Sequence, residues 1–359
     1  MAALLCLIPA PTLAAAAEGR WETAIPENAA GWTSSALFPD GTGYIANGSG
    51  RIYKTPDSGS TWLPLPEPGL SSGVEISFAS PELGYGVSGT GIYKTSDGAL
   101  TWETVEPPPG PSDVNGGRLF LDGISSPVGT EDVIVTGWTT VGGEDGCAQR
   151  RSKHYIARSS DEGTTWTVSR LGVPASTYEI EQLDAMSGLL LVHRFGEPEG
   201  SCNAATIRTE ASVVLLTRNG GRSFTKIHTA SLVDEDPVMS VAMPTADRIV
   251  LGTRGGRILL SNDGGKRFRV VAEVTAGALS ETRIIDSLAF GNRRIGYAGT
   301  NGTGVWRTAD GGRTWTQEES PFGIGYEDGL GLQRGSIAAA GSSRAIAIGP
   351  GAIARRAEN

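Results

Sequence analysis

The sequence predicts an all-β fold, a single seven-bladed β-propeller, and three observations carry that prediction. First, an eight-residue motif recurs six times: a small hydroxyl residue, any residue, Asp, any residue, Gly, any residue, Thr, then an aromatic residue. Second, successive copies are separated by a basic repeat length of forty to fifty residues, which is typical of propeller blades or solenoid repeats. Third, the two ends of the chain carry complementary fragments of one further unit.

The motif has the same two chemical anchors in each copy, an Asp or Asn and an aromatic residue. The acidic or amide positions are Asp57, Asp97, Asp161, Asn219, Asp263 and Asp310. The aromatic positions are Trp62, Trp102, Trp166, Phe224, Phe268 and Trp315. The spacings between successive copies are 40, 64, 58, 44 and 47 residues, so two units carry insertions.

The chemistry of this motif predicts a turn. An Asp or Asn side chain can accept hydrogen bonds from nearby backbone N–H groups, and the following Gly adopts a positive φ at little cost. The aromatic residue then starts the next strand and buries a large apolar surface between neighbouring units. Calcium binding is the alternative, but the spacing does not fit the calcium loop and Asn219 replaces Asp in one copy. We therefore expect structural turns and no metal.

Each motif lies between the third and fourth strands of a four-strand unit. In the second unit the expected strands are residues 74–80, 83–88, 91–97 and 101–106, and the sixth unit repeats the pattern over residues 286–319. Short strands rich in Val, Ile, Tyr and Trp and joined by Gly-containing turns are typical of a four-stranded meander. Solenoid rungs would be shorter, which favours the propeller. Asn47 and Asn301 begin glycosylation sequons, which we interpret as Asn-Gly turns.

The termini supply the seventh blade. Residues 335–341, 344–349 and 351–357 match the first three strands of a unit, and residues 19–25 match a fourth strand. Joining these segments removes the exposed sheet edges that invite aggregation. We therefore predict one propeller domain over residues 18–359, with a composite closing blade from 18–25 and 335–359 and with Trp21 paired beside Ile353.

The repeat resembles the Asp-box, or BNR, repeat family. That family includes sialidases, sortilin-type receptors, xyloglucan-cleaving glycosidases and photosystem II stability and assembly factors. The length of the chain and the strand pattern of its blades are most similar to those of the assembly factors and their secreted bacterial relatives. The resemblance covers nearly the whole mature chain and implies the fold, but it says little about function because one fold hosts many functions.

Export is expected from the first residues of the chain. Residues 1–17 carry no charge and are typical of the apolar part of a secretory signal peptide. A transmembrane anchor is disfavoured by the short apolar length and two prolines, so the mature form should have no spanning segment and should be secreted, periplasmic or in the cell envelope. After removal of the signal, Cys147 and Cys202 remain, and an even count in an exported chain predicts a disulfide. Two unpaired thiols are the alternative.

The composition and motifs bound the function classes. The net charge of −9 disfavours a nucleic-acid partner, and the chain has no nucleophile elbow, phosphate loop or dinucleotide fingerprint. The three histidines have no metal-ligand spacing. We expect no cofactor, and a catalyst is less favoured than a binding protein. A glycosidase is the main enzymatic alternative, although the Arg-Ile-Pro tripeptide of sialidases is absent and no acid pair can be assigned. A structural envelope protein is a third hypothesis.

Of these hypotheses, a monomeric scaffold that binds a protein or a carbohydrate requires the fewest special residues. Naming the strands of a blade a to d from the channel outward, the d–a and b–c loops share one face, and the motifs lie on the other. The first face carries the variable loops (107–118, 173–181, 228–238, 274–286 and 320–333) and both long insertions, as functional loops on a scaffold usually do. The candidate binding residues are Arg118, Arg150, Arg151, Lys153, Glu181, Asp236, Asp286 and Asp328.

Overall fold

The computed structural model describes most of the repeat region of the chain. The described residues are 20–24, 31–67, 69, 74–110, 119–139, 153–171, 176–195, 209–228, 236–274, 283–300, 304–318, 336–349 and 352–357. The expected signal segment 1–17, both cysteines of the expected disulfide and Asn301 lie outside them.

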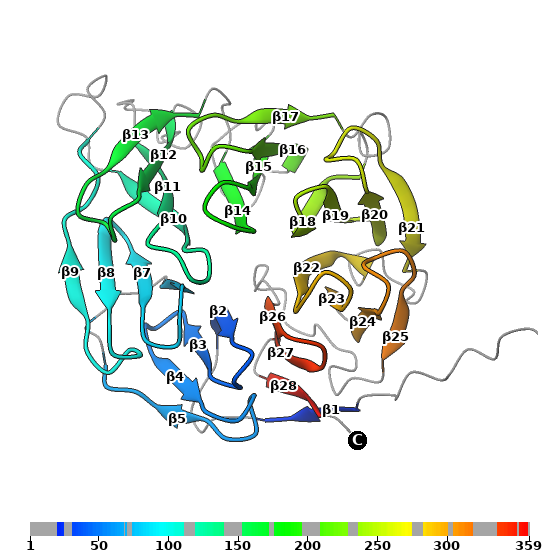
Figure 1. Ribbon diagram of the computed structural model, residues 1–359, viewed down its shortest axis with the longest axis horizontal. Coiled ribbons are helices and arrows are strands. Elements are labelled where there is room, and N and C mark those ends of the chain that lie inside the picture. Colours follow the sequence, from blue (N-terminus) through cyan, green and yellow to red (C-terminus); the bar gives the residue numbers. More distant parts are fainter. Residues whose placement is uncertain are drawn as a thin grey trace, which may run out of the picture.

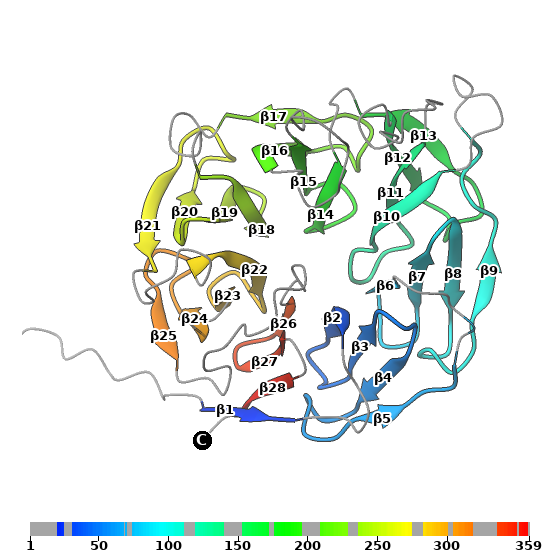
Figure 2. The ribbon, with the colours of Figure 1, turned by 180° about the vertical axis from the view of Figure 1, so that it is seen from behind.

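The described residues form seven four-stranded antiparallel sheets arranged around a central channel (Figures 1 and 2). Blade 1 is β2 (Trp32–Leu37), β3 (Gly43–Asn47), β4 (Ile52–Thr55) and β5 (Leu63–Pro64). Blade 2 is β6 (Glu75–Phe78), β7 (Gly84–Ser88), β8 (Gly91–Thr95) and β9 (Glu103–Val105). Blade 3 is β10 (Phe120–Ser125), β11 (Val133–Thr139), β12 (Lys153–Ser159) and β13 (Thr167–Arg170).

Blades 4 to 6 repeat this order of strands. Blade 4 is β14 (Ser176–Gln182), β15 (Gly188–Phe195), β16 (Thr209–Thr217) and β17 (Thr225–Ile227). Blade 5 is β18 (Val238–Thr245), β19 (Arg248–Thr253), β20 (Arg257–Ser261) and β21 (Arg269–Glu273). Blade 6 is β22 (Ile285–Phe290), β23 (Gly296–Thr300), β24 (Gly304–Thr308) and β25 (Thr316–Glu318). In each blade the first strand is the innermost (Figure 1).

Blade 7 is composite, as predicted. It consists of β26 (Ser336–Ala340), β27 (Arg344–Gly349) and β28 (Ala352–Ala357), and β1 (Arg20–Thr23) adds the outer strand. The predicted register is wrong by three residues, because Trp21 lies opposite Arg356 rather than beside Ile353. The tertiary reason is that this register brings the Trp21 indole N–H within 2.8 Å of the Glu318 carboxylate in blade 6.

The six motifs form the expected turns, and we call them Asp boxes below. In the first, the Thr55 hydroxyl donates to Asp57 Oδ1 at 2.9 Å and accepts the Gly59 N–H at 2.8 Å, while Asp57 Oδ1 also accepts the Thr61 N–H at 2.8 Å. All three bonds recur in the other five boxes. Each box has two successive residues with positive φ, and one is Ala99, where the motif leads us to expect Gly.

Every box aromatic packs against the blade that precedes it in the ring. Trp102 of blade 2, for example, joins Tyr44 and Ile52 of blade 1 in one apolar cluster. The same holds for Trp62, Trp166, Phe224, Phe268 and Trp315 in five other clusters. The rings therefore pack between units as predicted, with Trp315 buried and the other five partly buried. Because full burial of an apolar side chain contributes roughly 1.5–3 kcal/mol, each partly buried ring contributes a fraction of that to holding the blades together.

One segment that we expect to be a loop is largely strand, and a second ends in a strand. The expected loop 173–181 contains most of β14, and the expected loop 274–286 ends inside β22. In β14 the sequence alternates Glu179, Ile180 and Glu181, so one face meets the core while the other meets the channel. This alternation is typical of a strand, and it outweighs the polar composition that favours a loop. Asn47 occupies a turn as predicted, since its side-chain oxygen accepts the Ser49 and Arg51 N–H groups.

Candidate functional site

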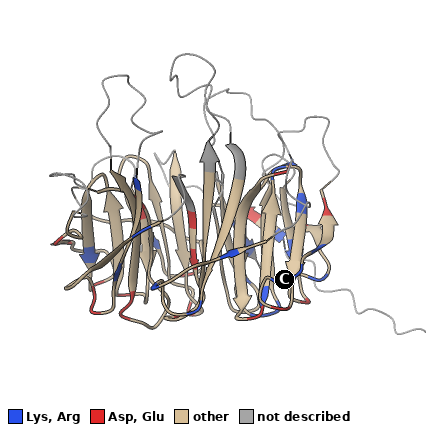
Figure 3. Cartoon of the chain, turned by 90° about the horizontal axis from the view of Figure 1, so that it is seen from above, with Lys and Arg blue, Asp and Glu red and all other residues tan. Residues whose placement is uncertain are grey.

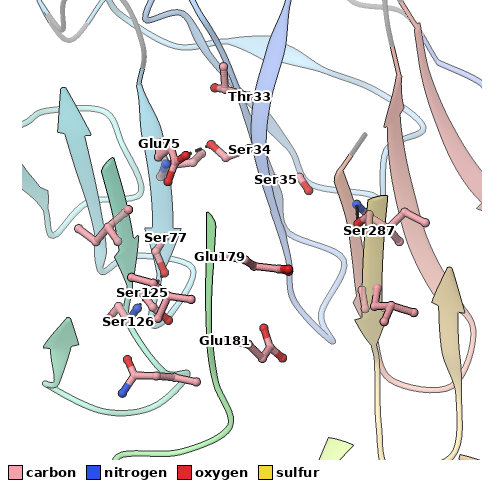
Figure 4. A pocket seen from close by; sticks show the side chains of 18 of the residues that line it. Thr33, Ser34, Ser35, Glu75, Ser77, Ser125, Ser126, Glu179, Glu181 and Ser287 are labelled. Atoms are coloured by element: carbon pink, nitrogen blue, oxygen red, sulfur yellow. Dashed lines mark hydrogen bonds between the residues drawn. The ribbon is translucent and has the colours of Figure 1, made fainter. Parts of the chain in front are cut away.

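The central channel is lined by residues from several blades. It holds a cavity of about 370 Å³ whose lining comes from the innermost strands β2, β6, β10, β14, β22 and β26. Serines contribute much of this lining, and five carboxylates join them. Figure 4 labels these serines together with Glu75, Glu179 and Glu181. The carboxylates are Glu75, Asp122, Glu179, Glu181 and Asp286. A polar, acidic surface thus lies on rigid strands at the axis of the propeller.

The five carboxylates lie at different depths because each strand a runs from the d–a loop toward the a–b turn. Glu75 is the first residue of β6 and Asp286 the second of β22, so both lie toward the d–a/b–c face. Glu181 is the sixth of the seven residues of β14 and lies toward the Asp-box face. The acidic lining therefore extends along the channel.

Three of the carboxylates are held by neighbouring groups. Glu179 accepts the Val241 N–H at 3.1 Å and Glu181 accepts the Met243 N–H, so both connect β14 to β18 in the next blade. Asp122 accepts the Thr136 hydroxyl at 2.7 Å. Serines connect other inner strands in a similar way: Ser34 accepts the Ile76 N–H at 3.0 Å. The polar residues of the channel therefore brace adjacent blades as well as lining the cavity.

Burial in the channel changes the protonation of Glu181. Desolvation raises the pKa of Glu181 to about 7, while the hydrogen bond from Met243 acts in the opposite direction. Figure 4 shows Glu179 and Glu181 extending from the same side of β14. At neutral pH this carboxyl group is about half protonated, whereas an ordinary glutamate is ionised.

Of the four predicted binding residues that the structure describes, two lie in the same cavity. Glu181 and Asp286 both line the cavity. Lys153 is the first residue of β12, at the b–c end of blade 3. Asp236 is 8 % exposed and accepts hydrogen bonds from the Gly255 N–H and, at 2.8 Å, from Arg257 Nε, so it holds the b–c turn of blade 5. The other four, Arg118, Arg150, Arg151 and Asp328, lie outside the described residues.

Sequence reasoning missed Glu75, Asp122 and Glu179. The signal that could have found them is an acidic residue flanked by apolar ones in an innermost strand, as in Val74-Glu75-Ile76. Within the described parts of the chain, no three His, Cys, Asp or Glu side chains come together as a set of metal ligands. The same residues include no helix of the length and apolar character needed to cross a membrane.

Comparison with known proteins shows the fold. No family model and no curated protein matches the chain in sequence. YCF48 from Cyanidioschyzon merolae superposes with a TM-score of 0.62 at 16% identity, covering 94% of this chain and 98% of that one. YCF48 bound to D1 peptide gives the same TM-score and identity, with 94% and 96% covered. The extracellular domain of the one component system BT4673 from B. thetaiotaomicron gives 0.56 at 14% identity, with 94% and 40% covered.

The chain is thus a seven-bladed β-propeller structurally similar to YCF48 and to the BT4673 extracellular domain. The predicted likeness to assembly-factor propellers is confirmed for the fold. Sequence identities this low establish only the fold, because proteins of the same fold have unrelated functions.

Proposed function

We propose that this protein is an exported, non-catalytic scaffold that binds a protein partner at the d–a/b–c face, where the central channel opens. The observation that carries the proposal is the acidic cavity on the propeller axis. Glu75 and Asp286 lie toward this face, and the deeper carboxylates add to the negative potential of the channel. A concave surface of one charge sign attracts an oppositely charged partner segment, so a Lys- or Arg-bearing segment fits it best.

Two further points support a protein ligand. YCF48, which has the same fold, has been solved bound to D1 peptide, so a propeller of this architecture can hold a peptide. In this chain the variable loops and both long insertions lie between strands d and a or b and c, and functional residues are usually carried by such loops on a rigid scaffold. Export is proposed from the uncharged, apolar residues 1–17.

Site-specific photo-crosslinking in the native cell tests which face binds. One variant carries a photoreactive amino acid at Phe120, which begins β10 at the d–a/b–c face and is 41 % exposed. The matched control carries it at Leu100, which is 54 % exposed in the second Asp box on the opposite face. We expect a partner to be captured from Phe120 and not from Leu100. Capture from Leu100 alone would place function on the other face, and capture from neither would favour the structural envelope protein.

A pair of charge-neutralising variants tests the role of the channel. Once a partner is identified, Glu75→Gln with Asp286→Asn should weaken its binding, because both changes remove negative charge from the channel while keeping side-chain shape. The control is Glu82→Gln with Glu131→Gln, two exposed carboxylates in a–b turns on the opposite face. Equal binding by both double variants would show that the channel carboxylates do not contribute.

One observation favours glycoside hydrolysis as a second candidate function. A glycosidase needs a carboxylic acid that keeps its proton near neutral pH and a second carboxylate nearby. Glu181, with a pKa raised to about 7, shares the cavity with Glu179 and Asp286. Release of a chromophore from aryl glycosides, abolished by Glu181→Gln, would establish the enzyme. Turnover of an alkyl glycoside, whose leaving oxygen must be protonated, would exclude Glu181 as the acid if it survived this substitution.

A further inference from the structure

The Asp-box face is divided into an acidic half and a basic half. The a–b turns and the c–d boxes form this face, seen along the lower rim of the propeller in Figure 3. The boxes of blades 1 to 3 contain no Lys or Arg, and the neighbouring a–b turns carry Asp40, Glu82 and Glu131. The corresponding box and turn residues of blades 4 to 6 include Arg218, Arg222, Arg248, Lys266, Arg267, Arg293, Arg294 and Arg313. Eight cations thus gather on one side of a chain whose net charge is −9.

Four of these arginines surround one cavity between blades 5 and 6. The cavity measures about 410 Å³ and is lined by Thr245, Arg248, Arg293, Arg294, Asp310 and Arg313. Its walls are the a–b turns of the two blades and the box of blade 6, which is tied to its own a–b turn by the Gly311 N–H bond to the Arg294 carbonyl at 2.8 Å. The volume falls within the roughly 300–1,000 Å³ of small-ligand sites.

Arg248 is fixed in place at the wall of this cavity. Its Nε donates to Asn262 Oδ1 at 3.1 Å, and its Nη1 donates to the Arg293 carbonyl at 2.9 Å. Both acceptors are uncharged, so the positive charge of the guanidinium is not neutralised. Partial burial lowers the pKa of Arg248, and the charges of Arg313 and Arg293 act in the same direction, whereas the carboxylate of Asp310 raises it.

The carboxylate of Asp310 is occupied within its own box. Oδ1 accepts the Thr308 hydroxyl and the N–H groups of Arg313 and Thr314, and Oδ2 accepts the Thr314 hydroxyl at 2.7 Å. Arg313 Nη1 donates to the Asp310 carbonyl oxygen at 2.6 Å instead of to this carboxylate. No carboxylate of the described chain forms an ion pair with any of the four arginines. The cavity therefore has four guanidinium groups against the single carboxylate of Asp310, and its net charge is positive.

We propose that this cavity binds a phosphoryl or sulfate group. Guanidinium groups present planar, paired N–H donors that match the oxygens of such anions, and the resulting charge-assisted hydrogen bonds are stronger than neutral ones. A tetrahedral anion offers oxygens to several walls at once and relieves the repulsion between the arginines. The group can be a free ion or be carried on a lipid headgroup. The site lies on the face opposite the proposed protein-binding surface and is independent of it.

Calorimetric titration with inorganic phosphate at constant ionic strength tests the proposal. The wild-type protein should bind phosphate saturably, and Arg293→Gln with Arg313→Gln should weaken binding about ten-fold or more. The control is Arg222→Gln with Lys266→Gln, which removes two positive charges from the same face outside the cavity. It is closely matched, because Arg222 donates to the Asn219 carbonyl in its box as Arg313 does to Asp310. The control should bind phosphate as the wild type does.

A second measurement distinguishes the source of the group. Co-sedimentation compares vesicles of phosphatidylcholine alone with vesicles containing phosphatidic acid. Binding to the second kind only, lost in the cavity variant, assigns a lipid-borne phosphoryl group. Phosphate binding without vesicle binding assigns a soluble anion. The proposal is overturned if the wild type shows no saturable phosphate binding, or if the two double variants, both still folded by circular dichroism, weaken it equally.

Discussion

Replacement of Arg356 by Met should destabilise the ring where the two ends of the chain meet. The Arg356 guanidinium donates from Nε and Nη2 to the two oxygens of Glu318, at 3.1 Å each, and lies 5.9 Å from the Tyr297 ring. The side chains of Arg356 and Glu318 are only 4 % and 10 % exposed. Removing one member of a buried ion pair costs up to about 3–5 kcal/mol, and we expect less than this here because Arg307, 3.8 Å away, and the Trp21 indole N–H still face the Glu318 carboxylate. Methionine keeps most of the aliphatic stem, so the loss reports the charge rather than the packing.

The neighbouring residue provides the matched control. Arg355 pairs with Glu22 at 2.6 Å, but these side chains are 26 % and 44 % exposed, so Arg355→Met should cost at most about 1 kcal/mol. The free energy of unfolding is measured in urea by tryptophan fluorescence. Adding Glu318→Gln to Arg356→Met should recover part of the loss, because it removes a buried carboxylate that has lost its main counter-charge. Equal costs for the two single variants, or no recovery in the double variant, would refute the reasoning.

Four further predictions concern the box, the channel, the closure and the crosslink. Hydrogen bonds from the Thr101 side chain and backbone lower the pKa of Asp97 to about 2. The ionised Asp97 carboxylate therefore stabilises the fold above pH 4, and this stabilisation is lost as the pH falls to about 2. Asp97→Asn should lower the urea midpoint at about pH 7 but not at about pH 2. The pKa of Glu181 is raised, so its ionisation destabilises the fold as the pH rises through about 7. Glu181→Gln should therefore stabilise the protein at pH 9 by up to roughly 3 kcal/mol and leave its stability unchanged at pH 4. Deletion of residues 18–25 should sharply lower the melting temperature, since it removes the outer strand of blade 7, and an unchanged melt would contradict that role. A Cys147–Cys202 bond should be found by non-reducing peptide mapping of exported protein, and it should add about 4 kcal/mol in the loop-entropy model, whereas two free thiols would exclude it.

The turns and the number of blades could be predicted from the sequence because the interactions that make them are local. In the first Asp box the Thr55 hydroxyl, the Asp57 carboxylate and the Thr61 N–H lie within seven residues of one another, so the motif and its structure coincide. The closing blade could be predicted as well, because residues 335–357 lack a fourth strand and residues 19–25 supply one.

The acidic channel could not be predicted in full because no local pattern brings its residues together. Glu75 and Asp286 are more than two hundred residues apart in the chain and meet only because seven innermost strands surround one axis. Glu181 is an ordinary glutamate in sequence, and its pKa rises only because the ring encloses it.

By itself, the sequence determined the repeating unit, the number of blades and the segments that close the ring, since hydrogen bonds within a turn and alternation along a strand depend on near neighbours. Only the tertiary structure decided the register of that closure and the composition of its sites. Trp21 lies opposite Arg356 because its indole meets Glu318, a residue 297 positions away. The basic cavity exists because two a–b turns and one box from adjacent blades meet at one edge. Such contacts join residues distant in sequence, and their geometry depends on how the blades pack.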